Sequence, residues 1–420
     1  MRLVLSIIIF LSVFTVSIAD AQLQLSLTQG VRGATPIAVL DFTGSKDAAA
    51  KLTTTIAHDL NNSGRLAADH FSTQQSNSDW RKAKINYTLS GSANCSGGSC
   101  SVDIVLDNVY SDNQRQLLDL NYHAKVADLQ QLAHTISDAV YQKLTGVRGV
   151  FNTRIAYVSR QGQGAQTKYN LVVADYDGAN PQVLFSSLWP VMSPAWSPDG
   201  SSVAYVSFEG NRAAIYLQDL LTGARKKILS APGINGAPAF SPDGAKMAIV
   251  ESTSGNPKIY LYDLKTAELS ALTDGYSIDT EPNFSPDGKG MVFTSNRGGT
   301  PQIYYYDFAS SNVKRITYAG PYNAHAEYLP DGTGLVYMHR NDFGWTIAYK
   351  DLSSGELNEL TDAGAAESPS IAPNGQMLIY ATRFGRRGGL AEVSLDTKVH
   401  LRLPTAQGSV QEPAWSPYLT

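Results

Sequence analysis

The sequence predicts a mostly β protein, in which a six-bladed β-propeller follows a small α/β domain. Two observations support this prediction. A turn motif returns at a nearly constant interval through the C-terminal part of the chain, and each interval holds four strand-like segments. Before that region, apolar residues follow helical spacing in two stretches. A repeat of about 40–45 residues with four strands is typical of a propeller blade.

The repeated turn has the sequence Ser-Pro-Asp-Gly, with complete copies at residues 197–200, 241–244 and 285–288. Pro presets the backbone of the second turn position, and Asp and Gly suit the positions that follow. We therefore interpret the Asp of this motif as a turn former rather than a catalytic acid. Counting three altered copies, the apolar residue before the turn recurs every 43 or 44 residues, at Trp196, Phe240, Phe284, Tyr328, Ile371 and Trp415.

The two ends of the repeat array set the number of blades. Residues 154–159 and 171–175 match the second and third strands of a blade, but no turn motif precedes them. Residues 413–416 near the C-terminus supply the missing first strand. The last strand then completes the first blade and closes the ring without open edges. This assigns residues 152–420 to a six-bladed propeller closed by its C-terminal strand.

Residues 36–147 are predicted to form the α/β domain. Residues 36–42 have the pattern of a strand, and residues 47–62 and 127–144 carry apolar side chains at helical spacing. A length of about 110 residues lies within the usual size range of a domain.

The chain has two cysteines, Cys95 and Cys100, on either side of a Ser-Gly-Gly-Ser turn between strand-like segments. This pattern indicates a β-hairpin, and in an oxidising compartment we expect the two thiols to form a disulfide. Two thiolates are fewer than the four ligands of a structural zinc site. No metal is therefore expected there.

Residues 1–21 have the pattern of a cleavable secretory signal. Arg2 precedes sixteen uncharged, mostly apolar residues, and Ala19-Asp20-Ala21 offers a small-residue cleavage site. The apolar run is shorter than the roughly 20 residues that span a bilayer. We expect export, cleavage before Gln22 and no direct membrane insertion. The net charge of −4 gives no electrostatic basis for binding nucleic acid.

Residues 22–35 are predicted to form an exposed N-terminal segment of the mature chain. Leu23, Leu25 and Leu27 alternate with polar residues, as in a strand with one apolar face. Such a strand could pair within its own domain or add to the sheet edge of a partner. The sequence leaves both possibilities open.

We find no set of residues suited to catalysis, and we predict that the protein is not an enzyme and carries no cofactor or metal. The chain has no Gly-x-Ser-x-Gly elbow, no H-x-x-x-H pair and no glycine-rich loop placed to bind phosphate. A competing class is an envelope enzyme or small-molecule-binding propeller. In that class, Glu281, Glu367 and Glu412 would supply the carboxylates that carbohydrate chemistry needs.

Binding is expected at one face of the propeller, which we call the mouth. The loops that enter the first strand of each blade, and those that join the second to the third, differ from blade to blade. The turns at the opposite face are nearly uniform. Variable loops on a rigid scaffold are where recognition usually takes place, so the mouth is predicted to bind other proteins.

These features resemble the TolB family, the periplasmic propeller proteins of the Tol-Pal system. The resemblance covers nearly the whole chain and includes Thr-Arg-Ile-Ala-Tyr at 153–157, Asn-Gly-Ala-Pro-Ala-Phe-Ser-Pro-Asp-Gly at 235–244 and the terminal segment 413–419. It implies a monomeric, non-enzymatic adaptor in the periplasm that supports outer-membrane integrity and constriction during cell division.

The resemblance also implies two binding sites. The mouth would bind the peptidoglycan-associated lipoprotein Pal, and the N-terminal segment would bind the C-terminal domain of TolA. That segment would switch between docking on its own protein and release toward TolA. The Pal-binding residues would be Asn235, Gly236, Ala237, Thr280 and Glu281, and the TolA-binding residues would be Leu23, Gln24, Leu25, Ser26 and Leu27.

Overall fold

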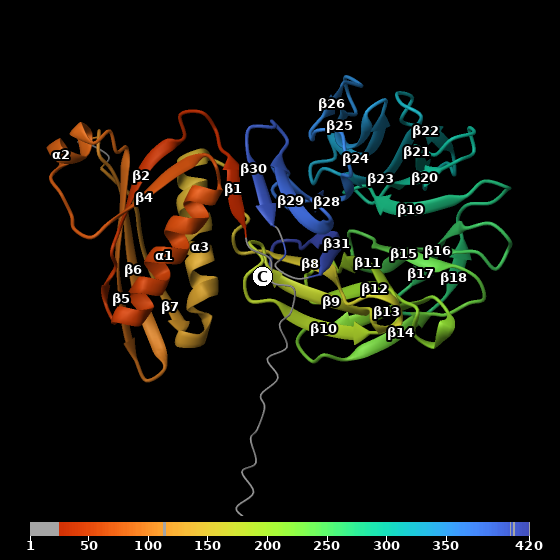
Figure 1. The fold of residues 1–420 in the computed structure, drawn as a ribbon, viewed down its shortest axis with the longest axis horizontal. Helices are drawn as coiled ribbons and strands as arrows, with labels where there is room; N and C mark the ends of the chain where they lie inside the picture. The colour runs from red at the N-terminus through yellow and green to blue at the C-terminus, as the bar shows by residue number, and fades with distance from the viewer. Residues whose placement is uncertain (1–24, 112–114, 404, 406–407, 420) are drawn as a thin grey trace, which may run out of the picture.

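The computed structural model describes residues 25–111, 115–403, 405 and 408–419. Figure 1 shows an α/β domain, coloured red to yellow, beside a propeller, coloured yellow to blue. The predicted fold class is confirmed. The predicted signal peptide and the site residues Leu23 and Gln24 lie outside the described residues. Among the helices of the described part, none combines the length and the apolar character needed to cross a bilayer.

The α/β domain is a mixed sheet with two long helices packed on it. The strand order is β4-β2-β5-β6-β7, with the short β3 pairing β5; β2 runs parallel to β4 and β5, and the pairs β5–β6 and β6–β7 are antiparallel. Apolar stripes on both long helices join the sheet in one core, because residues three and four apart share a helix face. The elements are β2 (Thr35–Leu40), β3 (Thr43–Gly44), α1 (Lys46–Asn62), β4 (Leu66–Phe71), α2 (Asn77–Lys82), β5 (Tyr87–Ser96), β6 (Ser99–Asn108), β7 (Gln116–Lys125), η1 (Val126–Asp128) and α3 (Leu129–Thr145).

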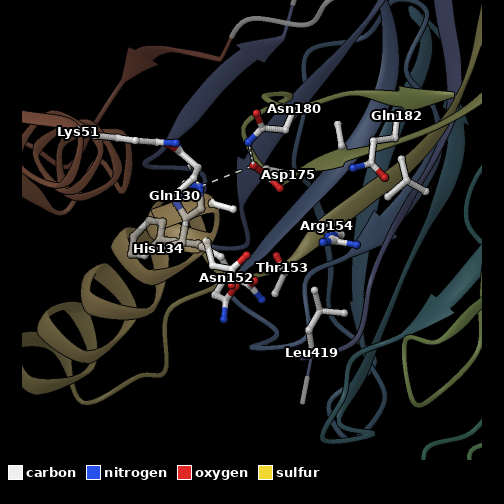
Figure 2. A pocket seen from close by; sticks show the side chains of 16 residues that line it. Lys51, Gln130, His134, Asn152, Thr153, Arg154, Asp175, Asn180, Gln182 and Leu419 are labelled. Carbon is white, nitrogen blue, oxygen red and sulfur yellow. Dashed lines mark hydrogen bonds and ion pairs between the residues drawn. The ribbon is translucent and has the colours of Figure 1, made fainter. Parts of the chain in front are cut away.

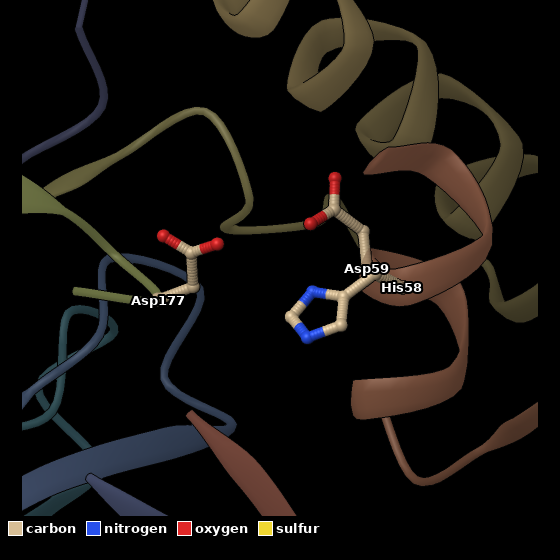
Figure 3. Close-up of side chains that lie close together, drawn as sticks. All are labelled: His58, Asp59 and Asp177. Atoms are coloured by element: carbon tan, nitrogen blue, oxygen red, sulfur yellow. The ribbon is translucent and has the colours of Figure 1, made fainter. Parts of the chain in front are cut away.

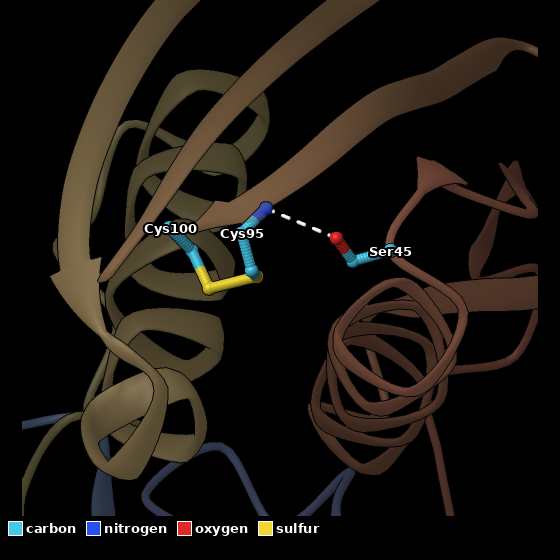
Figure 4. The surroundings of a disulfide bond; sticks show 3 residues. All are labelled: Ser45, Cys95 and Cys100. Atoms are coloured by element: carbon cyan, nitrogen blue, oxygen red, sulfur yellow. Dashed lines mark hydrogen bonds between the residues drawn. A yellow bond between two sulfur atoms is a disulfide. The ribbon is translucent and has the colours of Figure 1, made fainter. Parts of the chain in front are cut away.

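The predicted disulfide is confirmed at the tip of the β5–β6 hairpin (Figure 4). Cys95 and Cys100 are direct cross-strand partners, and the two glycines of the turn adopt positive φ. The backbone N–H of Cys95 donates a hydrogen bond of 3.0 Å to Oγ of Ser45, the residue before α1. The hairpin tip is therefore tied to the start of the first helix.

The propeller consists of six antiparallel sheets, numbered here as blades I to VI. As predicted, the C-terminal strand β31 completes blade I by pairing with β8. From the inner to the outer strand, the blades are: I, β31 (Ser409–Trp415), β8 (Arg154–Gln161), β9 (Lys168–Asp175), β10 (Gln182–Ser187); II, β11 (Val191–Trp196), β12 (Ser202–Ser207), β13 (Ala214–Asp219), β14 (Arg225–Leu229); III, β15 (Asn235–Phe240), β16 (Lys246–Glu251), β17 (Lys258–Asp263), β18 (Leu269–Ala271); IV, β19 (Asp279–Phe284), β20 (Gly290–Ser295), β21 (Gln302–Asp307), β22 (Val313–Arg315); V, β23 (Tyr322–Tyr328), β24 (Gly334–Asn341), β25 (Gly344–Asp351), β26 (Leu357–Glu359); VI, β27 (Glu367–Ile371), β28 (Met377–Phe384), β29 (Arg387–Ser394), β30 (His400–Leu403). Short 3-10 turns lie at η2 (Gly164–Gln166) and η3 (Glu209–Asn211).

The Ser-Pro-Asp-Gly motif forms the turn between the first and second strands, as predicted. In blade II, Asp199 Oδ1 accepts hydrogen bonds from Ser197 Oγ at 2.5 Å and from the N–H of Ser201 at 3.0 Å. Gly200 closes the turn with φ of +70°. These bonds hold the pKa of the Asp199 carboxyl below its usual range. Asp in this motif therefore shapes the turn.

The described part of the N-terminal segment, residues 25–35, is largely exposed or partly exposed, but it is attached to the propeller. Strand β1 (Ser26–Gln29) pairs antiparallel with β30, the outer strand of blade VI, so that it forms a fifth strand of that sheet (Figure 1). Leu25 is only 5% exposed, and Leu27 packs against the same core. An outer strand offers unpaired backbone groups, and apolar side chains gain stability by burial beside it. The segment thus pairs with the propeller rather than with its own domain's sheet.

The α/β domain rests on the face of the propeller opposite the mouth. Its contacts reach turns of blades I and VI: Arg65 forms an ion pair of 3.0 Å with Asp396, and Asn374 donates to the carbonyl of Arg148 at 3.2 Å. Tyr176, after β9, donates to Asp59 of α1 at 2.9 Å. These turns lie at the same end of the blades as the Ser-Pro-Asp-Gly turns.

Candidate functional site: the propeller mouth

The inner strands of the six blades surround a central channel of about 640 Å³. In all six blades, the register of the inner strand against the second strand shifts across two residues, the second of which is Pro or, in blade V, Ala. One residue in every bulge adopts the left-handed conformation, with φ between +43° and +52°. We call these six residues, all of which line the channel, the channel ring: Ser193, Ala237, Glu281, His325, Ser368 and Glu412.

The channel ring stores backbone strain. A left-handed residue with a Cβ costs roughly 1–2 kcal/mol, and a bulge re-aims the side chain that it carries. The left-handed conformation recurs in every blade because the surrounding sheet holds the backbone in it. Such outliers concentrate at functional sites, which makes the ring a candidate site.

Carboxylates of the ring connect neighbouring blades. Glu281 Oε2 accepts hydrogen bonds from the backbone N–H of His325 at 2.9 Å and from Thr294 Oγ1 at 2.7 Å. Glu412 accepts from the backbone N–H of Ser193. The bonds from the N–H groups of His325 and Ser193 satisfy the donor of the next bulge around the ring, so these side chains help to keep the blades in register.

The channel is acidic. Glu327 and Glu367 line it together with the two ring glutamates, and His325 Nδ1 lies 3.8 Å from Glu281 Oε1. Burial raises the pKa of Glu327, whose Oε2 accepts from the N–H of Ile371 at 2.9 Å. Burial likewise raises the pKa of Glu412. The three residues of the competing carbohydrate hypothesis, Glu281, Glu367 and Glu412, are thus brought to one channel, and two of them carry structural hydrogen bonds.

The residues predicted to bind Pal divide into two groups. Ala237 and Glu281 belong to the channel ring, and Gly236 and Thr280 stand one residue before them at the mouth. Asn235 is 1% exposed, and its amide bonds the backbone N–H and carbonyl of Ala231 at 3.1 and 2.7 Å. The Asn235 side chain therefore holds the loop at residues 231–235 in place.

Asp279 occupies in blade IV the position that Asn235 occupies in blade III, and it belongs to a buried ion cluster. Asp279 is 0% exposed and contacts Lys258 Nζ at 3.1 Å, Arg297 Nη2 at 3.0 Å and Ser295 Oγ at 2.6 Å. Burial raises the pKa of Asp279, but hydrogen bonds from Ser295 and Arg297 outweigh burial and hold the pKa below its usual range. The cluster fixes the loop that leads to Thr280 and Glu281.

A set of exposed apolar side chains surrounds the mouth, and sequence reasoning missed it. Tyr276 is 97% exposed and Phe343 is 87% exposed. The members of this set all lie on loops of one face of the propeller, and aromatic residues are enriched at interfaces. The signal in the sequence was the presence of large apolar residues in loops flanked by Gly, Asn or Pro. We call this set the apolar rim: Leu188, Trp189, Ile234, Tyr276, Ile278, Tyr318 and Phe343.

The residues predicted to bind TolA lie elsewhere. Of the five, Leu25, Ser26 and Leu27 belong to the described part and lie on or beside β1, at the outer edge of blade VI. The structure does not place them with the channel ring.

Comparisons with known proteins show similarity along almost the entire chain. Residues 23–115 match the TolB amino-terminal domain family, and residues 141–419 match the TolB beta propeller domain family. The Tol-Pal system protein TolB of Coxiella burnetii is 59% identical, with 99% of this chain and 98% of that protein covered. The protein of the same name from Legionella pneumophila (strain Corby) is 56% identical, with 98% of each covered. The crystal structure of TolB from Acinetobacter baumannii superposes with a TM-score of 0.88 at 42% identity, covering 94% of this chain and all of that chain.

Proposed function

The chain belongs to the TolB family of Tol-Pal system proteins, and from this premise we propose that it is a periplasmic, protein-binding adaptor rather than an enzyme. It binds the lipoprotein Pal at the propeller mouth and the C-terminal domain of TolA through its N-terminal segment. In this role it supports outer-membrane integrity and constriction during cell division, as a monomer between its partners.

The observation that carries this proposal is the apolar rim around the mouth. Half of the exposed large apolar side chains in the described part of the chain lie on loops of this one face. A few buried aromatic residues usually carry most of the binding energy of an interface. The rim supplies such residues, and the channel ring gives the interface a polar centre.

The predicted Pal-binding residues would contribute to binding in two different ways. Glu281 lines the channel, and both Glu281 and the preceding Thr280 are partly exposed. Asn235 acts by positioning, because its amide is occupied by backbone bonds to Ala231 and Ala213. A partner that settles on the rim would contact the loop that Asn235 supports.

The N-terminal segment is the second site in this proposal, and β30 and TolA compete for it. Leu25 and Leu27 pack against the propeller. TolA can therefore bind them only after β1 has separated from β30. A segment with two mutually exclusive partners is a two-state element, and any ligand that prefers one state shifts the other.

Calorimetric titration of the mature protein with the periplasmic domain of Pal from the same organism tests the mouth. We expect saturable binding that Tyr276→Ser and Phe343→Ser each weaken about tenfold or more, since truncated hot-spot residues typically cost over 1 kcal/mol. Leu221→Ser is the matched control, because Leu221 is 94% exposed on a turn at the opposite face.

Two results contradict the proposal. One is no binding between folded proteins. The other is an equal loss with Leu221→Ser and with the rim variants, which would show that the mouth has no special role.

A further inference from the structure

A polar crevice separates the α/β domain from blade I on the side away from the mouth. Its volume is about 320 Å³, and residues of α1, α3 and the β8–β9 sheet line it (Figure 2). His134 of α3 faces Asp175 of β9 across this crevice. The two side chains come from different domains.

His134 is held in one orientation from behind. Its Nδ1 lies 2.8 Å from Asp59 Oδ2, and the other oxygen of Asp59 accepts a hydrogen bond of 2.9 Å from the hydroxyl of Tyr176. Asp59 is 0% exposed and His134 is 2% exposed. When a carboxylate accepts a hydrogen bond from Nδ1–H of a neutral imidazole, the lone pair lies on Nε2, which is the arrangement that orients histidine ligands of metals.

The Nε2 atom of His134 lies near carboxylates of the propeller. Asp175 Oδ2 lies 3.9 Å away, beyond hydrogen-bond range, and the amide nitrogen of Gln130 lies at 3.3 Å. Donor atoms of His134, Asp175 and Asp177 all lie within 4.8 Å of one another. Asp177 also lies within the same distance of donor atoms of Asp59 and His58 (Figure 3).

The charges at this place do not balance. Within the part of the chain that the structure describes, the ion pairs of Asp59 and Asp175 are made with His134. Lys51 and Arg154 also line the crevice, but within the described residues neither forms an ion pair with these carboxylates. One imidazole cannot neutralise three carboxylates, and burying unpaired charge is costly.

An independent observation points in the same direction. Glu392 of β29 is 2% exposed, and its Oε1 has no hydrogen-bond partner. Its carboxyl lines a small cavity together with Tyr176, the residue that bonds Asp59. Glu392 is therefore a buried carboxyl with an unpartnered oxygen in a cavity beside the crevice, since Phe151 lines both, and added positive charge nearby would stabilise it.

We infer that the group of His134, Asp175 and Asp177, of which the first two line the crevice, is a site for one divalent transition-metal ion, with His134 Nε2, Asp175 and Asp177 as ligands and Asp59 as the carboxylate that orients His134. One imidazole with two carboxylates is a donor set that suits Zn²⁺. Zinc bonds of about 2.0–2.2 Å to nitrogen and oxygen place tetrahedral donors roughly 3.4 Å apart. The three groups need to approach one another by about 1 Å to reach this geometry.

The ligands come from both domains, so a bound ion joins them. A ligand that binds the native state alone raises stability by mass action. The ion therefore fixes the α/β domain against blade I.

Titration calorimetry with Zn²⁺ on the untagged mature protein, first treated with a chelator, tests the site. We expect one equivalent of Zn²⁺ to bind, and Asp177→Asn and His134→Gln each to weaken binding at least tenfold. Asp177→Asn keeps the acceptor for the N–H of Ala179, so its fold should survive, which circular dichroism checks. Asp243→Asn, in an exposed turn of blade III, is the control and should bind Zn²⁺ normally.

Absence of stoichiometric binding to the wild-type protein overturns the inference, as does binding that Asp177→Asn leaves unchanged. A thermal unfolding scan adds a second readout. Zn²⁺ should raise the unfolding temperature of the wild type and of Asp243→Asn, and a rise of the same size in Asp177→Asn would assign the ion to another place.

Discussion

Asp138 shows how a single buried carboxyl joins the domains. Its two oxygens accept hydrogen bonds from the backbone N–H groups of Phe151 at 2.9 Å and Asn152 at 3.3 Å, in the segment that leads into the propeller. A Cβ on Gly149 would meet Asp138 Oδ1 at 2.3 Å, so the chain passes this carboxyl only because residue 149 is glycine. Sequence analysis treated this helix face as ordinary core and did not anticipate the charge.

We expect Asp138 to make folding stability depend on pH. Burial raises its pKa to about 6 from the ordinary 3.8. A group whose pKa is raised by folding contributes stability that is complete below its ordinary pKa and is lost as pH rises through the folded value. The contribution is on the order of 2–3 kcal/mol, and it disappears between about pH 4 and 6.

Asp138→Asn should remove this dependence, because the amide keeps an acceptor for Phe151 and does not ionise. Urea unfolding at a series of pH values from 4 to 7 measures it. The variant should show a flatter dependence of the unfolding midpoint over this range, and an unchanged dependence would refute the assignment to Asp138.

Asp279 presents the opposite case, a carboxylate stabilised in its charged form. Asp279→Ala would leave Lys258, whose side chain is only 4% exposed, without its ion partner. Breaking a buried pair in this way typically costs about 3–5 kcal/mol. We expect a clear loss of stability by chemical denaturation and weaker Pal binding, because the loop before Thr280 loses its support.

Two variants control this prediction. Glu268→Ala, in an exposed turn of blade III, should have little effect. Lys258→Met added to Asp279→Ala should restore part of the lost stability by removing the unpaired ammonium group. If the double variant were no more stable than Asp279→Ala, the ion pair would not be the cause.

At the scale of single elements, the hairpin of β5 and β6 is stabilised by its disulfide. Closing a short loop removes conformational entropy from the unfolded chain, worth about 2 kcal/mol for a loop of this length. The double variant Cys95→Ser, Cys100→Ser should lower the unfolding midpoint of the α/β domain accordingly. Pal binding should stay unchanged, because the hairpin tip lies beside α1 and away from the mouth. Loss of Pal binding would contradict this separation of roles.

The pairing of β1 with β30 allows the proposed competition with TolA to be tested by a reversible lock. Ser26 and Arg402 are direct cross-strand partners, and such pairs lie near the separation that a disulfide needs. With Ser26→Cys and Arg402→Cys, the oxidised protein should bind the C-terminal domain of TolA at least tenfold more weakly than wild type. Reduction should restore binding, while the wild-type protein treated with the same reductant serves as control. Equal binding in the oxidised state would show that β1 need not leave β30.

The elements also show where sequence reasoning succeeded. The blades could be predicted because each turn encodes its own geometry: Pro, Asp and Gly occupy positions that a turn requires, as at residues 197–200. The hairpin and its disulfide followed from local spacing for the same reason. The position of β1 did not, because its partner strand lies over 370 residues away and any unpaired sheet edge could have accepted it.

On the scale of the whole molecule, the candidate site was only partly predictable. Resemblance to a family led to Ala237 and Glu281, but the left-handed bulges that bring them into one ring depend on how six sheets meet. The crevice at His134 and Asp175 was hidden for a similar reason, since it forms only when the two domains pack together. Exposure of the rim residues likewise depends on tertiary structure, because an apolar residue in a loop is as easily buried as exposed.

The central claim is that a protein partner covers the mouth. Hydrogen–deuterium exchange of the mature protein, with and without the periplasmic domain of Pal, tests it most directly. The account predicts slower exchange in the loops that carry the rim and ring, at residues 231–237 and 274–281, and unchanged exchange in the turns at 197–201 and 241–245. Protection confined to those opposite turns or to the α/β domain, in a complex that forms at full occupancy, would contradict it.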